Sequence, residues 1–248
     1  MRKLDLIFDM DDTLSDCGIF YKAQQTTFAE FQSKRTGLPV ELITELREKI
    51  DVTFTQTPDG FSRVRFPRSF ASTSMTIDVM LGNKVDEVAA YQSYELGDEV
   101  FNAMYPLFEG VPEMLSTFYD SGHRLFLMTK GDYEVQTRKI NINGLRKWFH
   151  NDRIYILGQK STRALEDVIA NHTMDKSRTV VIGDSLRDDI GVANDVGVTS
   201  VWVSGRHNAS WTYENTHHKP HYQIEHVVDL VNLIDTKSSQ FVSVMESV

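Results

Sequence analysis

The stretch Leu4-Asp5-Leu6-Ile7-Phe8-Asp9-Met10-Asp11-Asp12-Thr13 determines how the rest of the chain is interpreted. A short apolar run ends in three carboxylates, those of Asp9, Asp11 and Asp12. The run is typical of a buried strand, and the acids then fall at its carboxyl end. In open parallel sheets this edge is where ligands bind.

The carboxylates of Asp9 and Asp11 are two residues apart, so the periodicity of a strand sends both side chains to one side. Adjacent carboxylates repel and raise each other's pKa unless a cation separates them. A hard divalent ion such as Mg2+ would do so, because it prefers oxygen ligands. Taken alone, the acids are equally compatible with a polar turn that follows a strand.

Composition limits the classes of protein that fit. The chain has 248 residues, of which 41% are hydrophobic and 25% charged, as in ordinary globular proteins with one domain or a domain plus an insert. A net charge of -9 argues against broad nucleic-acid binding, which needs a basic face. No apolar run approaches a membrane span, and the single cysteine, Cys17, suits a reducing compartment. We therefore expect a cytoplasmic protein without nucleic-acid or membrane partners.

Helical patterns fill the region that follows the first strand. The spacing of apolar residues predicts helices over 19–35, 39–50, 72–81 and 85–104, with a loop over 53–70. Within that loop Arg63, Arg65 and Arg68 stand among Phe61, Phe66 and Phe70. These residues predict either an anion- or base-binding patch or a solvated loop with buried phenyl rings.

From residue 106 onward strands alternate with helices. The pattern predicts strands over 123–129, 153–157, 179–182 and 199–203, and helices over 111–119, 133–142, 162–171 and 188–196. A loop over 204–220 and a last helix over 227–234 complete the chain. This alternation predicts an α/β fold, a doubly wound parallel sheet with right-handed crossovers and an inserted α-helical domain.

Polar side chains follow several of the predicted strands. Thr129 ends the second strand, Asp184 follows the fourth, and Lys160 lies just after the short third one. Because the carboxyl ends of parallel strands share one edge of the sheet, we expect these groups to meet Asp9 and Asp11 there.

The ordered set resembles the motifs of the haloacid dehalogenase (HAD) superfamily. The segment Asp9-Met10-Asp11-Asp12-Thr13 is similar to its first motif, Asp-x-Asp-x-Thr. Thr129 resembles the second motif and Lys160 the third, and Gly183-Asp184-Ser185 followed by Asp188-Asp189 resembles the fourth. The segment 105–112 is similar to the place where the family's chain returns from a helical cap. The likeness covers residues 4–203.

The resemblance implies a domain organisation. A HAD-like, Rossmannoid catalytic core would comprise residues 1–14 and 106–248, and a helical cap domain would comprise residues 15–105. By its location the cap is expected to close over the catalytic edge and to select the leaving group.

The resemblance also implies catalytic roles for four residues. Asp9 would be the nucleophile that attacks phosphorus to form an aspartyl-phosphate, and Asp11 the general acid and then the base for water. Thr129 would donate a hydrogen bond to the phosphoryl group. Lys160 would neutralise the charge of Asp9 and the phosphate.

A Mg2+ site is implied by the same motifs. Its expected residues are Asp9, Asp11, Asp184 and Asp189, and the Met10 carbonyl is expected as a backbone ligand. Asp189 is expected to orient Lys160 or a metal-bound water, with the neighbouring Asp188 as the alternative for that role.

The motifs say less about the residues that bind the substrate. Thr129, Lys130 and Lys160 are the expected phosphate-binding residues, although Lys130 occupies a position where many relatives have a small or amide residue. Its amine is expected either to contact substrate or to point to solvent.

The implied function is a Mg2+-dependent phosphatase that hydrolyses a small phosphomonoester through an aspartyl-phosphate. The superfamily also contains dehalogenases, phosphonatases and mutases, but Asp11 and Asp184 together favour phosphoryl transfer over carbon–halogen cleavage. A sugar phosphomutase and a catalytically idle phosphate-binding module are the alternatives. The expected partner is a small phosphorylated metabolite of unspecified identity, and the sequence carries no signal for the oligomeric state.

Overall fold

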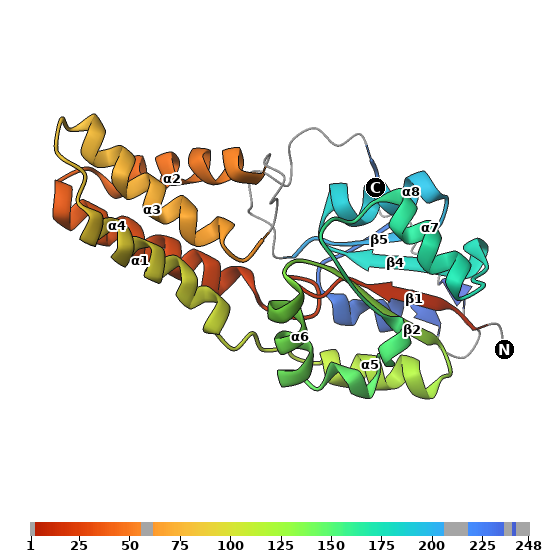
Figure 1. The fold of residues 1–248 in the computed structure, drawn as a ribbon. Helices are drawn as coiled ribbons and strands as arrows, with labels where there is room; N and C mark the ends of the chain where they lie inside the picture. Colours follow the sequence, from red (N-terminus) through yellow and green to blue (C-terminus); the bar gives the residue numbers. More distant parts are fainter. Residues whose placement is uncertain (1–2, 56–61, 206–217, 236–239, 242–248) are drawn as a thin grey trace, which may run out of the picture. The chain divides into compact units, whose positions relative to one another are not determined.

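The computed structural model describes residues 3–55, 62–205, 218–235 and 240–241 (Figure 1). The chain divides into two compact units. The first contains Met1–Asp16, Pro106–Lys130 and Ile140–Val248, and the second contains Cys17–Tyr105 and Gly131–Lys139. No helix in the described ranges is long and apolar enough to cross a membrane.

A six-stranded sheet forms the centre of the first unit. Its strands are β1 (Asp5–Phe8), β2 (Arg124–Lys130), β3 (Ile154–Leu157), β4 (Thr179–Gly183), β5 (Thr199–Val203) and β6 (Tyr222–Ile224). The spatial order is β3-β2-β1-β4-β5-β6, and every neighbouring pair is parallel. The predicted α/β fold with a doubly wound parallel sheet is therefore confirmed.

The strands are apolar on both faces because each face is covered by helices. Alternate residues enter different cores: Leu6 and Phe8 pack on one side of β1, and Ile7 packs on the other. Helices α5 (Val111–Asp120) and α9 (Leu230–Leu233) cover the first side. Helices α7 (Thr162–Asn171) and α8 (Val192–Val196) cover the second, as Figure 1 shows for α7 and α8. The strand order places the carboxyl ends of β1, β2 and β4 side by side.

Short elements complete this unit. They are the 3-10 turns Leu145–Lys147, Asn151–Arg153, Lys176–Arg178 and Val227–Asp229, a π-helical turn at Leu186–Gly191, and the antiparallel pair β7 (Ile234–Asp235) and β8 (Gln240–Phe241). The predicted last helix over 227–234 is therefore shorter, and β6 was not predicted. Residues 206–217 of the predicted loop lie outside the described ranges.

The second unit consists mainly of helices. They are α1 (Gly18–Thr36), α2 (Val40–Thr55), α3 (Arg65–Met80), α4 (Glu87–Asp98) and the 3-10 turn Glu99–Asn102. Phe28, Ile43, Phe70 and Ile77 form part of its buried core. Part of α6 (Tyr133–Ile142) belongs here too, because Arg138 donates to the carbonyls of Phe101 and Asn102 at 2.6 and 2.9 Å.

The predicted loop over 53–70 is wrong at both ends, because α2 continues to Thr55 and α3 begins at Arg65. Arg63 pairs with Asp98 at 3.1 Å, and Arg65 pairs with Asp51 at 2.5 Å. Arg68 is exposed, whereas Phe66 and Phe70 are buried. The phenyl rings therefore pack in the helical core, where a base cannot stack on them.

Close packing of α3 against α4 requires Gly97. A Cβ at this position would lie 2.7 Å from the Cα of Pro67, which is backbone and cannot rotate away. We expect Gly97→Ala to lower the free energy of unfolding by about 1–3 kcal/mol, measured by denaturant titration. Gly158→Ala is the matched control, because a Cβ there meets nothing within 4 Å; an equal effect of both substitutions would contradict this assignment.

Candidate active site

The loop after β1 turns sharply and places Asp9 at the carboxyl edge of the sheet. The amide of Asp9 still donates to the carbonyl of Ile182 on β4 at 2.9 Å, which anchors it to the neighbouring strand. Asp12 then adopts a left-handed conformation with φ of 60°, which Asp tolerates better than most residues. The Asp9 side chain is 7% exposed, so its carboxylate is largely desolvated.

The same turn surrounds the Met10 carbonyl with hydrogen-bond donors. This oxygen accepts from the amides of Leu14 and Ser15 at 2.9 and 3.0 Å, and from the Ser15 hydroxyl at 3.3 Å. These hydrogen bonds show that the Met10 carbonyl stabilises the loop. That it also binds the metal stays a prediction.

Lys160 lies between two buried carboxylates. Its Nζ is 2.5 Å from Asp9 Oδ1 and 2.5 Å from Asp189 Oδ1, and all three side chains are less than a tenth exposed. Burial alone would lower the pKa of Lys160, but the carboxylates of Asp189 and Asp9 raise it above its ordinary value. Lys160 is therefore a permanent cation beside Asp9.

The acidic groups of the site have perturbed pKa values. Burial is the largest cause that raises the pKa of Asp9 to about 7; the charges of Asp189 and Asp11 raise it further, and Lys160 opposes the rise. Burial, followed by the charges of Asp9 and Asp189, also raises the pKa of Asp184 well above its ordinary value. Such shifts are typical of functional sites, where charges are held close together before a ligand binds.

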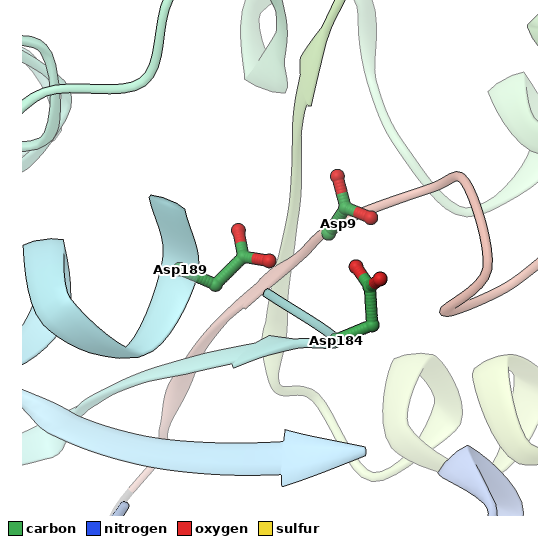
Figure 2. A group of neighbouring side chains, drawn as sticks. All are labelled: Asp9, Asp184 and Asp189. Carbon is green, nitrogen blue, oxygen red and sulfur yellow. The ribbon is translucent and has the colours of Figure 1, made fainter. Parts of the chain in front are cut away.

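Asp9, Asp184 and Asp189 converge from three different segments (Figure 2). Each offers a carboxylate oxygen, and these oxygens lie within 4.8 Å of one another. Thr13 Oγ1 donates to Asp184 at 3.5 Å, and the indole of Trp202 donates to the Asp184 carbonyl at 2.7 Å. A cluster of carboxylate oxygens this close together suits a hard divalent cation, because such an ion offsets their repulsion.

Asp188 and Asp189 point to different lysines although they are adjacent in the chain. Both lie in the π-helical turn Leu186–Gly191, a conformation that is often found at functional sites. Asp189 accepts from Lys160 and, at 3.1 Å, from the amide of Ser185. Asp188 instead forms an ion pair with Lys130, the last residue of β2.

Gly183 gives Asp189 the space to reach Lys160. A Cβ at position 183 would lie 2.3 Å from Asp189 Cγ, so any side chain there displaces the carboxylate. If the site is catalytic, we expect Gly183→Ala to lower kcat by roughly tenfold to a hundredfold, because small displacements of positioned groups are costly. Steady-state kinetics measure this effect, and an unchanged kcat would show that the position of Asp189 is unimportant.

The structure brings together most of the predicted site residues. Asp9, Lys160, Asp184 and Asp189 meet, and Thr129 is fully buried on the neighbouring strand β2. Asp11 is half-buried and lies outside the group of three carboxylates, so its acid–base role stays a prediction. Sequence reasoning missed the contacts of Thr13 and Trp202 with Asp184, since nothing in their spacing signals them.

Comparisons with known proteins agree with this geometry. Residues 156–230 match the family described as HAD-hydrolase-like. Over 132 residues the chain is 24% identical to pyrimidine 5'-nucleotidase PynA of Streptococcus pneumoniae, a match that covers 51% of this chain. The matched part spans only 53%, about half, of the length of that curated relative.

Solved structures show the fold over nearly the whole chain. A haloacid dehalogenase-like family hydrolase from Xanthomonas campestris matches with a TM-score of 0.71 and 18% identity, covering 96% of this chain and 95% of the other. The HAD-hydrolase YfnB from Bacillus subtilis, in a structure bound to magnesium, matches with a TM-score of 0.62 and 18% identity, covering 94% and 98%. L-2-Haloacid dehalogenases, among them one from Xanthobacter autotrophicus, have the same fold. The resemblance to the superfamily predicted from the motifs is thereby confirmed.

Proposed function

We propose that the chain is a hydrolase of the HAD superfamily and, more specifically, a Mg2+-dependent phosphatase acting on a small phosphomonoester. The observation that carries this proposal is the contact of Asp9 with Lys160 at 2.5 Å, beside the carboxylate of Asp184. A buried carboxylate beside a permanent cation is suited to attack an electrophile. The same cation then balances the charge of the phosphoryl group that has been transferred to Asp9.

Asp9 and Asp184 are the residues that would hold Mg2+. Both oxygens of Asp189 already accept hydrogen bonds, one from Lys160 and one from Ser185, so Asp189 acts mainly by orienting Lys160. When bound, the cation would neutralise charge on the phosphoryl oxygens. A magnesium-bound relative with this fold supports the choice of metal.

In the proposed reaction Asp9 attacks phosphorus, and the leaving oxygen departs with a proton from Asp11. The resulting aspartyl-phosphate is then hydrolysed by a water that Asp11 deprotonates. Lys160 stays charged throughout and stabilises the negative charge that builds up on the phosphoryl group. Thr129, whose strand ends beside Asp9, would bind a phosphoryl oxygen.

The acidic cluster favours phosphoryl transfer over carbon–halogen cleavage. Cleavage of a carbon–halogen bond needs no acid for the leaving group and no cation, so Asp11 together with the clustered oxygens of Asp9 and Asp184 favours phosphoryl transfer. The nucleotidase relative makes pyrimidine nucleoside monophosphates the first specific substrates to test. We also propose that the helical unit, predicted as residues 15–105, is the cap that selects the leaving group, and that the protein is cytoplasmic.

The decisive experiment is a phosphomonoester panel that contains p-nitrophenyl phosphate, sugar phosphates and pyrimidine nucleoside monophosphates. We expect release of inorganic phosphate with Mg2+ and its loss with EDTA, followed by recovery when Mg2+ is added back. Isomerisation of a sugar phosphate without free phosphate would favour a mutase. Phosphate binding without turnover on the whole panel would favour an idle binding module.

A further inference from the structure

Two lysines at the carboxyl edge of the sheet are held by two consecutive acids. Lys160 contacts Asp189, and Lys130 contacts Asp188. The first pair belongs to the site described above. The second pair has no place in the proposed reaction, although it forms beside the same residues.

The Lys130–Asp188 pair is well enclosed. Its side chains are only 16% and 13% exposed, and the other carboxylate oxygen of Asp188 is 2.8 Å from Arg187 Nε. Although burial acts to raise the pKa of Asp188, its cationic neighbours, first Lys130, hold it below its ordinary value. Ion pairs with this degree of burial are costly to break, because a largely buried charge then loses a partner.

The pair crosses the strand that carries the nucleophile. Lys130 ends β2 and Asp188 follows β4, and β1 lies between these two strands in the sheet. Asp188 also lines a cavity of about 10 Å³, room for one water, together with Asp9, Lys160 and Asp189. The Lys130–Asp188 pair therefore joins the ends of β2 and β4, the two strands that flank the strand leading to Asp9.

Hydrogen bonds connect this pair to Asp189. The amide of Asp188 donates to Ser185 Oγ at 3.0 Å, and the amide of Ser185 donates to Asp189 Oδ2 at 3.1 Å. The other oxygen of Asp189 binds Lys160. A shift of Asp188 would therefore move the turn that aims Asp189 at Lys160.

We propose that Lys130 is a positioning residue: through Asp188 it holds the turn Leu186–Gly191 so that Asp189 stays against Lys160. This inference rests on the proposed phosphatase function, and it replaces the expectation that the Lys130 amine binds substrate or points to solvent. For direct contact with a phosphate, Lys130 would first have to leave Asp188 and expose that carboxylate to the incoming anion.

The two roles predict different kinetics for Lys130→Met, Asp188→Asn and the double variant. If Lys130 positions the turn, each single variant lowers kcat roughly tenfold to a hundredfold and leaves KM within about twofold. The double variant is then no worse than either single one, because both remove the same contact. Lys130→Arg recovers part of kcat, since it keeps a cation in reach of Asp188. A rise in KM with unchanged kcat in Lys130→Met, together with normal kinetics of Asp188→Asn, would overturn the proposal.

A second readout does not depend on turnover. Hydrogen exchange of the amides in residues 185–191 should speed up in Lys130→Met and in Asp188→Asn, relative to the wild type. Arg124→Met is the matched control, because it removes an ion pair with Asp5 at the opposite end of the same strand; it should leave exchange in 185–191 and kcat unchanged. A wild type without phosphatase activity would refute the proposed function, whereas unchanged exchange in Lys130→Met would refute the positioning role.

Discussion

Asp9→Asn is expected to lower kcat for any phosphomonoester by about a thousandfold or more. The amide cannot form the acyl-phosphate. Among the residues that the structure describes, the only other carboxylate in contact with Lys160 is that of Asp189, which also accepts from the Ser185 amide. The measurement is single-turnover release of inorganic phosphate with Mg2+ in excess. Retention of more than about a tenth of the wild-type kcat would contradict the nucleophilic role.

Stability separates this loss from misfolding. Burial raises the pKa of Asp9 to about 7, so the ionised carboxylate costs the metal-free folded protein stability as pH rises from the ordinary pKa of 3.8 toward 7. Removal of that charge should therefore leave the melting temperature at about pH 8 unchanged or higher. Asp5→Asn is the matched control, because Asp5 is a buried carboxylate on the same strand, 2.5 Å from Arg124; it should lower stability and leave kcat unchanged.

The sequence predicted the edge of the sheet at which these groups meet, for a simple physical reason. Buried parallel strands are continuous apolar runs, and a polar residue directly after such a run must lie at the carboxyl edge. Asp9, Thr129 and Asp184 each follow or end such a run. The order of the motifs then predicted a resemblance to the superfamily, and both the family match over residues 156–230 and the fold agree with that resemblance.

The sequence does not predict in which direction an individual carbonyl or side chain points. The left-handed residue Asp12, for example, turns the chain so that the amides of Leu14 and Ser15 donate to the Met10 carbonyl, and no pattern in the sequence signals these contacts. The same holds for the adjacent acids Asp188 and Asp189, whose side chains a π-helical turn directs to different lysines. A turn of this kind leaves no periodic pattern in the sequence.

Local composition misled the prediction in two other places. The segment 53–70 is rich in Thr, Pro and Arg and was predicted as a loop, but Phe66 and Phe70 drive the start of α3 into the helical core. Tertiary burial here outweighs weak helix propensity. Strand β6 was missed because it is three residues long and half polar, and its pairing with β5 alone makes it a strand.

Lys160→Met is expected to have the second large effect, on stability as well as on activity. The substitution leaves Asp9 and Asp189 buried without the cation that contacts both at 2.5 Å. Loss of one member of a buried ion pair typically costs about 3–5 kcal/mol, so the free energy of unfolding should fall by a similar amount at about pH 8. Denaturant titration of the metal-free protein measures this change. Phosphatase kcat should fall by about a hundredfold or more, since no other cation touches Asp9 in the described contacts.

The pH dependence of this loss has a definite sign. Lys160 opposes the rise in the pKa of Asp9, so removal of the lysine must raise that pKa above about 7. At about pH 8 the wild-type carboxylate is largely ionised and paired, whereas the variant must either keep an unpaired charge or bind a proton at a cost. At about pH 5 Asp9 is mostly protonated in both proteins, so their difference in stability should shrink.

Lys176→Met provides the comparison that isolates the carboxylates. Lys176 lies in the same unit and donates to the carbonyl of Val196 at 2.9 Å. Its removal therefore costs a hydrogen bond but, among the described contacts, leaves no carboxylate without its cation. Its effect should be about 1 kcal/mol and independent of pH. Excess Mg2+ should restore part of the stability of Lys160→Met and none of that of Lys176→Met, because only the former leaves repelling oxygens for a cation to bring together. A pH-independent loss in Lys160→Met would mean that the charge of Asp9 does not depend on Lys160, and the electrostatic basis of the site would have to be abandoned.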